Sequence, residues 1–487
     1  MKISVIIPCY NAAEHLPRSV HSVKKQGIDG TEVIVVDDAS NDATVAVAER
    51  LRTELPNLRI IVQPVNGGAA KARNAGLQQA RGQYICFLDA DDAYGDGVFE
   101  RVLAVLDETP WIQAIDFPVR LVNNHREVSR PHLRAITNSV PSNLILRREL
   151  AQAIGGFPES RDFRTKLAGE DVVFRDTVRN WGNIWRLNDV FLDYTVRPGG
   201  HFDRFMDRAR VENDTLQLLP DENDSVVSQG VSEYVRQTTQ RMRLQAGIQR
   251  TRVLHIKTEN RAFNFETFDN DASFKHAEQT LQGNVYPAIP FVSNAASVLD
   301  IGANIGASAV TFASRYPNAR VVAVEPSRRP FILLRSNTSA YRTIESYNVG
   351  LFSTTMKRSL FLGGVDSVTN SVIRSALTST VDEEIQLVAA DAFAAQIGMT
   401  RPDIIKIDTE GCELPIISAM AQSFGAAKIV YLEYHSEDDR LAIDKILART
   451  HILFSGKIPF PHRGELVYVR NDAFPTQNER DRWRIGN

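Results

Sequence analysis

Short, β-branched runs alternate with helix-like segments from the start of the chain, and this alternation constrains the fold more strongly than any other feature. The strand-like runs are ISVIIP, TEVIVVDDAS, LRIIVQP and QYICFLDA, and the helix-like segments between them are AAEHLPRSVHSVKKQ, DATVAVAERLRTEL and AAKARNAGLQQA. This order predicts a parallel sheet that is covered by helices on both faces. Each run ends in polar or glycine-rich residues, and ligands of such sheets bind at the carboxyl ends of the strands.

A second alternating pattern fills the C-terminal half of the chain. The segment SVLDIGANIGASAVTFASRYPNARVVAVEPS has the pattern of a strand, a glycine turn, a helix and a strand. The runs IIKIDTEGCE and IVYLEYH add two strands that end in carboxylates. A chain of 487 residues is too long for a single core. The sequence therefore predicts an α/β protein with two different nucleotide-binding sheets in series.

A polar, helix-favouring stretch separates the two patterns. No strand is expected between 212 and 252, and Val231, Tyr234, Val235 and Met242 recur there at helical spacing, which predicts a packed helical connector. We expect four segments along the chain. They are an N-terminal domain at 1–210, the connector at 211–255, a second domain at 256–475 and a C-terminal tail at 476–487.

The composition is that of a globular protein, with 43% hydrophobic and 24% charged residues. The net charge of -3 argues against a nucleic-acid-binding protein, which needs a basic face. No apolar run reaches the roughly 18 residues of a transmembrane helix, and MKISVIIPCYN is too short for a signal peptide. Three well-separated cysteines match no zinc spacing and fit the reducing cytoplasm, where we expect the protein.

The fourth strand-like run leads into the acidic sequence LDADD. Asp89 and Asp91 are two residues apart, so their carboxylates point to the same side of an extended strand end. Two such carboxylates can hold a divalent cation, and hard oxygen ligands suit Mg or Mn. A helix cap or a solvated turn would also explain a single Asp-X-Asp sequence. The neighbouring strand ends, VVDDASND with Asp37 and Asp38 and NGGAAKARNAG, favour a phosphate or ribose ligand.

Four segments, in this order, resemble a family 2 glycosyltransferase of the GT-A fold: SVIIPCYNAAEHLPRSVHSV, VIVVDDASND, GGAAKARNAGL and YICFLDADD. The resemblance covers roughly the first 200 residues and implies transfer of a sugar from a nucleotide-diphosphate donor, usually with inversion at the anomeric carbon. It also implies which residues bind. The nucleotide sugar would contact Pro8, Tyr10, Asn11, Asp38, Arg73 and Asp89, and Asp91 would be the main metal ligand, with Asp89 beside it.

The same resemblance places a general base in a Glu-Asp pair that follows a glycine-containing loop. IGGFPES and LAGEDVVF fit this arrangement through Glu170 and Asp171, with Asp171 as the base. A carboxylate pair that only favours the helix dipole is the alternative. The later segment DYTVRPGGHF resembles a part that closes over the donor in some members. By this resemblance Arg197 would meet phosphate and His201 would complete the metal shell, although a lone loop histidine is more often merely solvated.

In the second pattern, the glycine turn follows a strand and precedes a helix. Gly302 allows a tight turn, Gly306 allows close helix packing or ligand approach, and Asp300 lies at the turn. Glu325 ends the next strand, where an acid binds ribose hydroxyls in Rossmann-type sites. NAD, flavin and S-adenosylmethionine all suit such a turn, but GANIG contains only two glycines, which disfavours a dinucleotide.

The segments LDIGANIG, VVAVEPS, YNVGLFS, DIIKIDTEGCELPII and IVYLEYH together resemble an FkbM-type methyltransferase with a Rossmann-like class I fold. The resemblance covers about residues 297–469 and implies methylation of a hydroxyl oxygen by S-adenosylmethionine, often on a sugar. Three groups of cofactor contacts are implied. They are Asp300, Gly302, Asn304 and Gly306 for the methionine part, Glu325 for the ribose, and Asn348 to Gly350 for the adenine.

The sequence KIDTEG supplies the least specific part of this site. Lys406, Asp408 and Glu410 alternate along it, so they share one face for as long as the strand lasts. They could act as a catalytic base, as acceptor contacts or as metal ligands, and a salt-bridged strand end explains them equally well. His435 is a further candidate base, although a structural role is the more common one for such a residue.

These observations predict a bifunctional enzyme of polysaccharide biosynthesis. It would transfer a sugar to a glycan acceptor in a metal-dependent step and O-methylate the glycan or the glycosylated product. A lipid-linked acceptor would bring this cytoplasmic protein to the inner face of the membrane. In the alternative, only one domain is catalytic and the other binds substrate. Asp91, Asp171 and Glu325 are all present, which favours two working sites.

Overall fold

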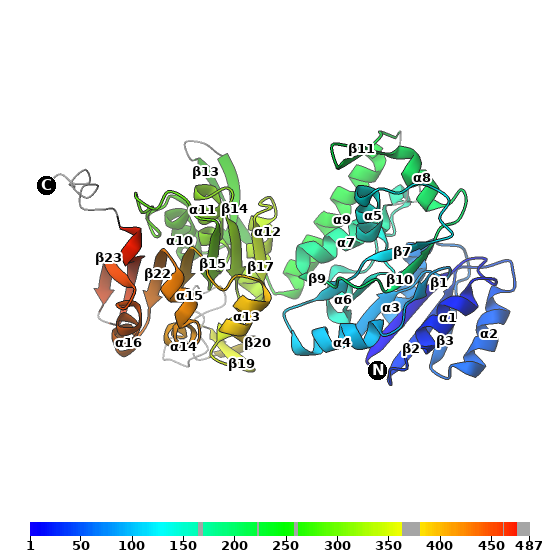
Figure 1. Cartoon of the computed structure of the whole chain (residues 1–487), viewed down its shortest axis with the longest axis horizontal. Helices are drawn as coiled ribbons and strands as arrows, with labels where there is room; N and C mark the ends of the chain where they lie inside the picture. Colours follow the sequence, from blue (N-terminus) through cyan, green and yellow to red (C-terminus); the bar gives the residue numbers. More distant parts are fainter. Residues whose placement is uncertain (164–168, 222–223, 258–261, 363–379, 461, 475–487) are drawn as a thin grey trace. The chain divides into compact units, whose positions relative to one another are not determined.

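The computed structural model describes residues 1–163, 169–221, 224–257, 262–362, 380–460 and 462–474 (Figure 1). The tail predicted at 476–487 lies outside the described residues. The chain divides into two compact units, Met1–Gln245 and Ala246–Asn487. Each unit contains one large sheet, and both units have the α/β architecture that the alternating sequence pattern predicts.

The first unit is built on a seven-stranded sheet with the order β3-β2-β1-β4-β8-β6-β9. Its strands are β1 (Ile3–Cys9), β2 (Thr31–Asp37), β3 (Leu58–Val62), β4 (Tyr84–Phe87), β6 (Ala114–Asp116), β8 (Leu144–Arg147) and β9 (Ile184–Arg186). The strands from β1 to β4 pair in parallel, as predicted. β8 runs antiparallel to both of its neighbours, and β9 is parallel to β6. The parallel pairing brings the carboxyl ends of β1 to β4 to one edge of the sheet.

Helices pack closely on this sheet. In α3, which contacts β1 and β2, Gly76 lies so near the sheet that a Cβ atom would come within 2.4 Å of the Ile6 side chain. The helices of the unit are α1 (Leu16–Lys24), α2 (Thr44–Glu54), α3 (Ala69–Gln79), α4 (Val98–Glu108), α5 (Arg130–Ser139), α6 (Arg148–Ile154), η1 (Arg161–Phe163), α7 (Glu170–Trp181), α8 (His201–Arg208) and α9 (Asp224–Gln245). A second sheet contains β5 (Ala93–Tyr94), β10 (Leu192–Thr195) and β7 (Val119–Val122).

Helix α9 packs against the first unit. Tyr234 and Met242 are buried, and the Tyr234 hydroxyl donates a hydrogen bond to the carbonyl of Gly156. The guanidinium of Arg241 donates to the carbonyl of Ile154 over 2.6 Å. The structural division of the chain therefore falls after this helix, between Gln245 and Ala246.

The segment predicted as a connector differs from its structure in three respects. Val235, predicted to pack with the other three residues, is 41% exposed. Adjacent residues of a helix point in directions about 100° apart, and here Tyr234 takes the buried position. β12 (Thr215–Leu218), which pairs with β11 (Ala209–Glu212), lies where no strand was expected; its partner in a hairpin, rather than an apolar pattern, makes it a strand. The division after Gln245 also differs from the predicted limits at 210 and 255.

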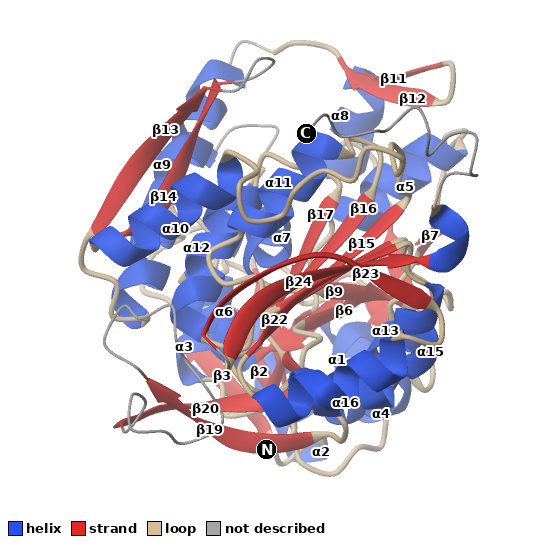
Figure 2. Cartoon of the chain, turned by 90° about the vertical axis from the view of Figure 1, so that its left-hand side faces the viewer, coloured by secondary structure: helices blue, strands red, loops and turns tan. Residues whose placement is uncertain are grey.

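The second unit is built on a seven-stranded sheet, most strands of which are labelled in Figure 2. The sheet has the strand order β17-β16-β15-β21-β22-β24-β23. Its strands are β15 (Ser297–Ile301), β16 (Arg320–Val324), β17 (Ile344–Tyr347), β21 (Ile404–Ile407), β22 (Ile429–Tyr434), β23 (His451–Phe460) and β24 (Arg463–Arg470). Neighbouring strands among β17, β16, β15, β21 and β22 pair in parallel. β24 is antiparallel to both of its neighbours, β22 and β23. The strand order reverses between β15 and β21, and ligands of open α/β sheets bind at this kind of switch point.

The other elements of the second unit cover or extend this sheet. They are α10 (Asp271–Leu281), α11 (Ala307–Arg315), α12 (Arg328–Thr338), α13 (Ala390–Gln396), α14 (Glu413–Ala419), α15 (Ala421–Ala426), α16 (Glu437–Leu447), η2 (Asn471–Ala473), the hairpin of β13 (Thr251–Lys257) and β14 (Ala262–Phe268), and the sheet of β18 (Gly350–Phe352), β20 (Thr380–Ala389) and β19 (Met356–Leu362). Phe312 from α11 and Tyr431 from β22 lie in one apolar cluster, so helix and sheet share a core.

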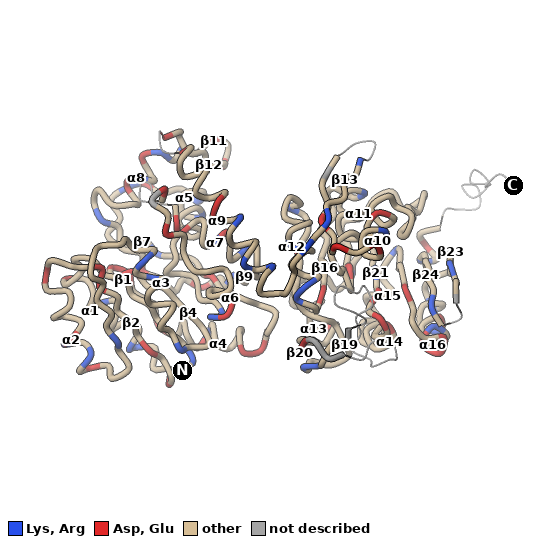
Figure 3. The backbone as a smooth tube through the Cα atoms, turned by 180° about the vertical axis from the view of Figure 1, so that it is seen from behind, with Lys and Arg blue, Asp and Glu red and all other residues tan. Residues whose placement is uncertain are grey.

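Surface charge and thiols complete the description of the fold. Acidic and basic residues are interspersed along both units (Figure 3). Among the described residues, no helix combines the length and the apolar composition that crossing a bilayer requires. Cys9, Cys86 and Cys412 are buried free thiols. Burial raises the pKa of Cys86 to about 12, so this thiol is unreactive at neutral pH.

The packing of α9 predicts that Tyr234→Ala destabilises the first unit. Tyr234 is only 9% exposed, and loss of a buried aromatic ring costs about 3–5 kcal/mol. Val235→Ala is the matched control, because its side chain is 41% exposed and such a change alters stability by about 0.5 kcal/mol or less. Calorimetry of the whole chain should show a lower unfolding temperature for the first unit in Tyr234→Ala alone. Equal effects of the two variants would contradict the assignment of α9 to this unit.

Candidate functional site

The first site lies at the carboxyl ends of β1, β2 and β4. Asp38 follows β2 and is buried, and its carboxylate accepts the backbone N–H groups of Gly67 and Gly68 over 2.8 and 2.7 Å. These bonds shape the glycine loop that opens α3, because both carboxylate oxygens are used to hold backbone donors. Asp38 therefore positions this loop, and its predicted contact with the nucleotide sugar stays a prediction.

The segment after β1 presents an aromatic ring to solvent. Tyr10 is 50% exposed, whereas Pro8 is a half-buried residue of β1. Asn11 has a left-handed backbone with φ of 50°, and its side-chain oxygen accepts the N–H of Asn41 over 2.8 Å. The bond ties the end of β1 to the loop after β2. An exposed ring on a braced loop is suited to stacking on a planar ligand.

Arg73 of α3 joins two of the predicted site residues. Its two terminal nitrogens lie 2.6 Å from Asp171 and 2.7 Å from Asp89, while the guanidinium itself is only 3% exposed. The guanidinium also lies over the ring of Phe157, 5.0 Å from its centroid. Asp89 and Asp171 remain 27% and 28% exposed, so a ligand can reach both carboxylates. The buried cation thus fixes the positions of a strand-end acid and a helix-start acid that are distant in sequence.

Asp171 lies in the first turn of α7, after Gly169, whose φ of 144° requires glycine. Burial raises the pKa of Asp171 to about 8; Arg73 opposes the rise, and Glu170 and Asp89 reinforce it. A carboxylate with a pKa near the working pH is a suitable general base. The predicted role of Asp171 therefore agrees with its electrostatic surroundings and stays a prediction.

The acids that follow β4 crowd together. Asp91 lies 2.7 Å from Arg197, and Asp92 is buried and accepts the N–H of Thr195 over 2.9 Å. Burial and the charge of Asp89 raise the pKa of Asp91, and Arg197 opposes the rise. A bound cation would offset the repulsion that raises the pKa of Asp91, and carboxylate oxygens are hard ligands that suit Mg or Mn. The donor set therefore fits the predicted metal through Asp89 and Asp91.

His201 is the first residue of α8. Burial lowers its pKa, with Arg204 acting in the same direction and Glu170 and Asp89 opposing. A neutral imidazole can bind a metal. Within the described residues, however, Asp89, Asp91 and His201 do not converge closely enough to form a three-ligand group. Metal binding by His201 therefore stays a prediction.

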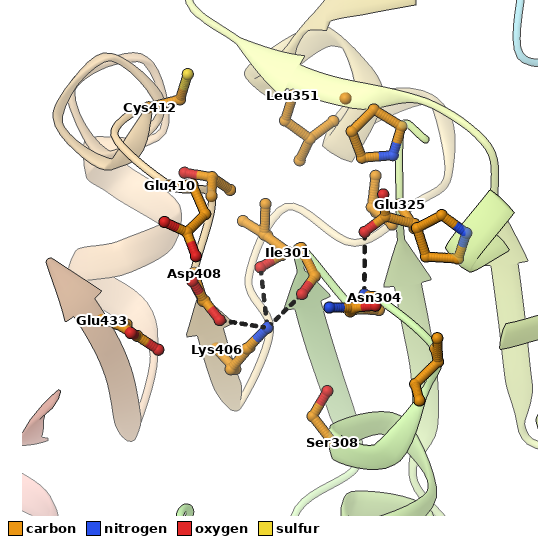
Figure 4. A pocket seen from close by; sticks show the side chains of 18 of the residues that line it. Ile301, Asn304, Ser308, Glu325, Leu351, Lys406, Asp408, Glu410, Cys412 and Glu433 are labelled. Carbon is orange, nitrogen blue, oxygen red and sulfur yellow. Dashed lines mark hydrogen bonds and ion pairs between the residues drawn. The ribbon is translucent and has the colours of Figure 1, made fainter. Parts of the chain in front are cut away.

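The second site is a cavity of about 280 Å³ at the carboxyl ends of β15, β16 and β21 (Figure 4). It lies at the switch point of the sheet. Eight predicted residues line it. They are Gly302, Asn304, Glu325, Val349, Gly350, Lys406, Asp408 and Glu410. Three other predicted cofactor contacts are not among the lining residues: Asp300, Gly306 and Asn348.

The glycine turn leaves no room for side chains. Gly302 has φ of 80°, and a Cβ atom there would lie 1.7 Å from the carbonyl oxygen of Asp408. Gly306, with φ of 95°, is the N-cap of α11, and a Cβ atom would meet Leu334 at 2.8 Å. Gly302 therefore lines the cavity beside the Asp408 carbonyl. Gly306 instead packs against Leu334 of α12 and does not line the cavity.

Glu325 organises the cavity wall as well as lining it. Its carboxylate accepts the N–H of Asn304 over 3.0 Å and that of Ser327 over 2.8 Å. Burial raises the pKa of Glu325 to about 7, and the two backbone donors oppose the rise. Asn348 donates to the carbonyls of Glu325 and Pro326 over 2.9 Å each, so it braces this loop from outside the cavity.

Lys406 of β21 is buried, and its ammonium group contacts a backbone carbonyl and two carboxylates. Its ammonium donates to the carbonyl of Gly302 over 2.5 Å and lies 3.3 Å from Asp300 and 3.9 Å from Asp408. Burial lowers the pKa of Lys406, but Asp300 and Asp408 outweigh it, and the net shift is upward. The ammonium stays protonated at neutral pH and cannot accept a proton. Asp300, whose other oxygen accepts the Ser308 hydroxyl over 2.6 Å, acts from behind the cavity.

Several polar residues of the cavity escaped prediction. Glu433 is the penultimate residue of β22, so the strand-end pattern could have indicated it, and burial raises its pKa to about 8. Arg463 of β24 also lines the cavity, 2.7 Å from Glu433. His276 of α10 is a further lining residue. Burial lowers the pKa of His276. No sequence signal indicates Arg463 or His276, because only the packing of α10 and the antiparallel β24 brings them here.

His435 lies directly after β22, between two carboxylates. Its Nε2 is 3.1 Å from Glu410, and its Nδ1 is 3.2 Å from Glu413. Glu413 is buried and also accepts the N–H groups of Thr409 and Gly411. This network joins the loop after β21 to β22, which is the structural role that the sequence favours for His435.

Two family models match the chain. Residues 4–160 match the model of glycosyl transferase family 2, and residues 300–452 match that of the methyltransferase FkbM domain. One match lies in each unit: the first includes Arg73 and Asp89 but ends before Asp171, and the second includes Glu325, Lys406 and Asp408.

Similar curated proteins resemble the chain over limited lengths. Poly(ribitol-phosphate) beta-N-acetylglucosaminyltransferase TarS of Staphylococcus aureus is 39% identical over 111 residues, which are 22% of this chain and 19% of that protein. The minor teichoic acid biosynthesis protein GgaB of Bacillus subtilis is 38% identical over 107 residues, 22% of this chain and 12% of that protein. Glycosyltransferase AglE of Haloferax volcanii is 26% identical over 213 residues, 41% and 68% of the two chains. The chain thus spans about a fifth or less of the first two relatives.

Among solved structures, residues 1–349 of S. aureus TarS in complex with UDP-GlcNAc match with 27% identity and a TM-score of 0.39, over 50% of this chain and 67% of that one. A mannosyltransferase of Pyrobaculum calidifontis in complex with GDP-Man and Mn2+ matches with 18% identity and a TM-score of 0.34, over 51% and 76% of the two chains.

The turn geometry predicts that Gly302→Ala disrupts the second unit. The new methyl group would collide with the carbonyl of Asp408, in addition to the strain of a positive φ. Gly398→Ala is the matched control, because Gly398 has φ of 66° but open space around the new atom. Urea unfolding should show a loss of more than about 1 kcal/mol for Gly302→Ala beyond that of the control. Equal losses would mean that the turn relaxes and that the close approach is unimportant.

Proposed function

From the fusion of a glycosyl transferase family 2 domain with a methyltransferase FkbM domain in this chain, we propose a bifunctional enzyme that builds and methylates a glycan. The first unit transfers a sugar from a nucleotide-diphosphate donor to a glycan acceptor. The second unit O-methylates the glycan or the glycosylated product with S-adenosylmethionine. The observation that carries the first half is the link from Asp89 through buried Arg73 to Asp171.

Sugar transfer in the first unit would be a single, inverting displacement. Asp171 accepts the proton of the acceptor hydroxyl as its oxygen bonds to the anomeric carbon. Arg73 keeps the Asp171 carboxylate in place, and Tyr10 and Arg197 contact the base and phosphates of the donor. Asp91 and Asp89 would hold Mg or Mn, which would supply positive charge to neutralise the leaving diphosphate. The exposed fractions of Asp89 and Asp171, 27% and 28%, support this division of roles.

Methyl transfer in the second unit would depend on positioning more than on acid–base chemistry. Gly302 and Asn304 would contact the methionine part of S-adenosylmethionine, and Glu325 would bind its ribose hydroxyls. The fit is supported by the absence of Cβ room at Gly302 and by the location of Glu325 at the cavity wall. S-adenosylmethionine supplies an electrophilic methyl group. The acceptor hydroxyl would approach from the side of Asp408 and Glu433, beyond the switch point.

A cell-surface polysaccharide is the acceptor class that we propose. Two of the similar proteins carry names that refer to poly(ribitol phosphate) and to minor teichoic acid biosynthesis. Acceptors of this class are joined to lipid carriers during synthesis in the scheme we propose, so the protein would work in the cytoplasm at the inner face of the membrane.

A crossed pair of variants tests the two-site proposal by ligand-induced stabilisation. A ligand at a hundred times its dissociation constant stabilises its unit by about 2.7 kcal/mol. We expect UDP, GDP, dTDP or CDP with Mn to stabilise the first unit, and S-adenosylhomocysteine to stabilise the second. Asp91→Asn should remove only the first effect and Glu325→Gln only the second, as measured by calorimetry. Loss of both effects in either variant would contradict two independent sites.

The pKa of Asp171 predicts the pH dependence of sugar transfer. The base works when deprotonated, so kcat/KM should rise with pH and level off above an apparent pKa of about 8. Asp171→Asn should lower kcat by roughly 10²–10⁴-fold, while the affinity for the nucleoside diphosphate stays unchanged. Release of nucleoside diphosphate from the donor, followed on both sides of pH 8, measures the profile. A variant with full activity would exclude Asp171 as the base.

A further inference from the structure

Three potential metal ligands converge at the end of the second cavity. One ligand atom from each of Asp408, Glu410 and His435 lies within 4.8 Å of the other two, and this is the one such group of His, Cys, Asp and Glu among the described residues. Asp408 and Glu410 belong to the loop between β21 and α14, and His435 follows β22. Two adjacent parallel strands therefore bring the group together.

The imidazole of His435 lies between two carboxylates. Its Nε2 is 3.1 Å from a carboxylate oxygen of Glu410, close enough for an ion pair. The ring is 12% exposed, so water has little access to it. On the other side, Nδ1 is 3.2 Å from Glu413, a carboxylate that orients a metal-binding histidine in the usual way.

Negative charge exceeds positive charge around this group. Four carboxylates are between 1% and 19% exposed. They are Asp408, Glu410, Glu413 and Glu433. Three cations lie beside them. Lys406 is held by Asp300 and by backbone carbonyls, and Arg463 lies 2.7 Å from Glu433 and 3.6 Å from Glu410. The third is His435, whose pKa burial lowers but Glu410 and Glu413 raise further. Because buried charges are paired or bind metals, this excess favours a further cation.

The group faces the part of the cavity that the cofactor would leave free. Asp408 and Glu410 line the cavity, and Figure 4 shows them with Glu433 on one side, while Asn304 and Glu325 lie on the other. A ribose bound at the end of β16 and a methionine part bound at the end of β15 would fill the second side. The reacting hydroxyl must then enter at the ends of β21 and β22.

We propose that Asp408, Glu410 and His435 form a divalent-cation site that holds the acceptor hydroxyl for methyl transfer. Two carboxylates and an imidazole suit Mn or Zn better than Ca, which prefers ligands that are all oxygen. Cation binding stands on the geometry of this group alone, whereas the part played by the hydroxyl rests on the proposed methyltransferase function.

The proposed step is balanced without any other reactant. The acceptor oxygen, bound to the cation, forms a bond to the methyl carbon of S-adenosylmethionine. The carbon–sulfur bond breaks, and its electron pair stays on sulfur to give S-adenosylhomocysteine. The proton of the hydroxyl passes to water. Lewis-acid binding lowers the pKa of the hydroxyl and orients its oxygen, and both effects accelerate the attack.

Mn2+ alone is the probe for this site, and Asp91→Asn protein is the background, so that the metal site proposed in the first unit does not contribute. Electron paramagnetic resonance should show one tightly bound Mn2+ per chain. Pulsed electron paramagnetic resonance should detect hyperfine coupling between the Mn2+ electrons and an imidazole nitrogen. His435→Gln should abolish this coupling and weaken binding by at least about 10-fold, by analogy with lost metal partners. Asp408→Asn with Glu410→Gln should abolish binding.

Asp391→Asn is the matched control, because this exposed residue changes the charge of the same unit outside the group. It should leave Mn2+ binding intact. Binding that persists in His435→Gln with unchanged coupling, or no binding in the Asp91→Asn protein, would overturn the proposal. Calorimetry with S-adenosylhomocysteine on the same samples separates the two ideas: stabilisation without Mn2+ binding refutes the cation site alone, and Mn2+ binding without stabilisation refutes the methyltransferase function while the cation site stands.

Discussion

Parallel pairing of neighbouring strands is the constraint on which both sites depend. In the first unit β2, β1 and β4 end at one edge, and in the second unit β16, β15 and β21 do the same. The acids that follow these strands therefore lie at one edge of each sheet: Asp38 and Asp89 in one unit, Glu325 and Asp408 in the other. Antiparallel pairing would send alternate strand ends to opposite edges and separate these carboxylates.

A buried cation stabilises the converging acids in each unit, but the two cations act differently. Arg73 offers a planar fork to Asp89 and Asp171, whose carboxylates stay open to a ligand. Lys406 donates to a backbone carbonyl and lies against Asp300, which has no exposed surface. The first arrangement organises reactive groups directly. The second fixes the glycine turn at Gly302, and Asp408 and Glu410 beyond it line the rest of the cavity.

Residues at strand ends could be predicted from the sequence, and most others could not. Asp89 and Glu325 each follow a strand, and the structure places both at the edges that the alternation predicts. The adenine contact of Asn348 stays a prediction, whereas the hydrogen bond from its amide to the carbonyl of Glu325 is visible only in the structure. His276 gave no signal, because an amphipathic helix carries many polar residues and only its packing shows which one faces the cavity.

The sequence by itself determined the two sheets, their parallel cores and the acids at their carboxyl ends, because hydrophobic periodicity and strand-end chemistry are local properties of the chain. The tertiary structure alone decided which of these acids meet. Asp171 reaches Asp89 only through Arg73, and His435 reaches Glu410 only because β22 lies beside β21. Charge interactions act between groups that are close in space, and no pattern along the chain records that proximity.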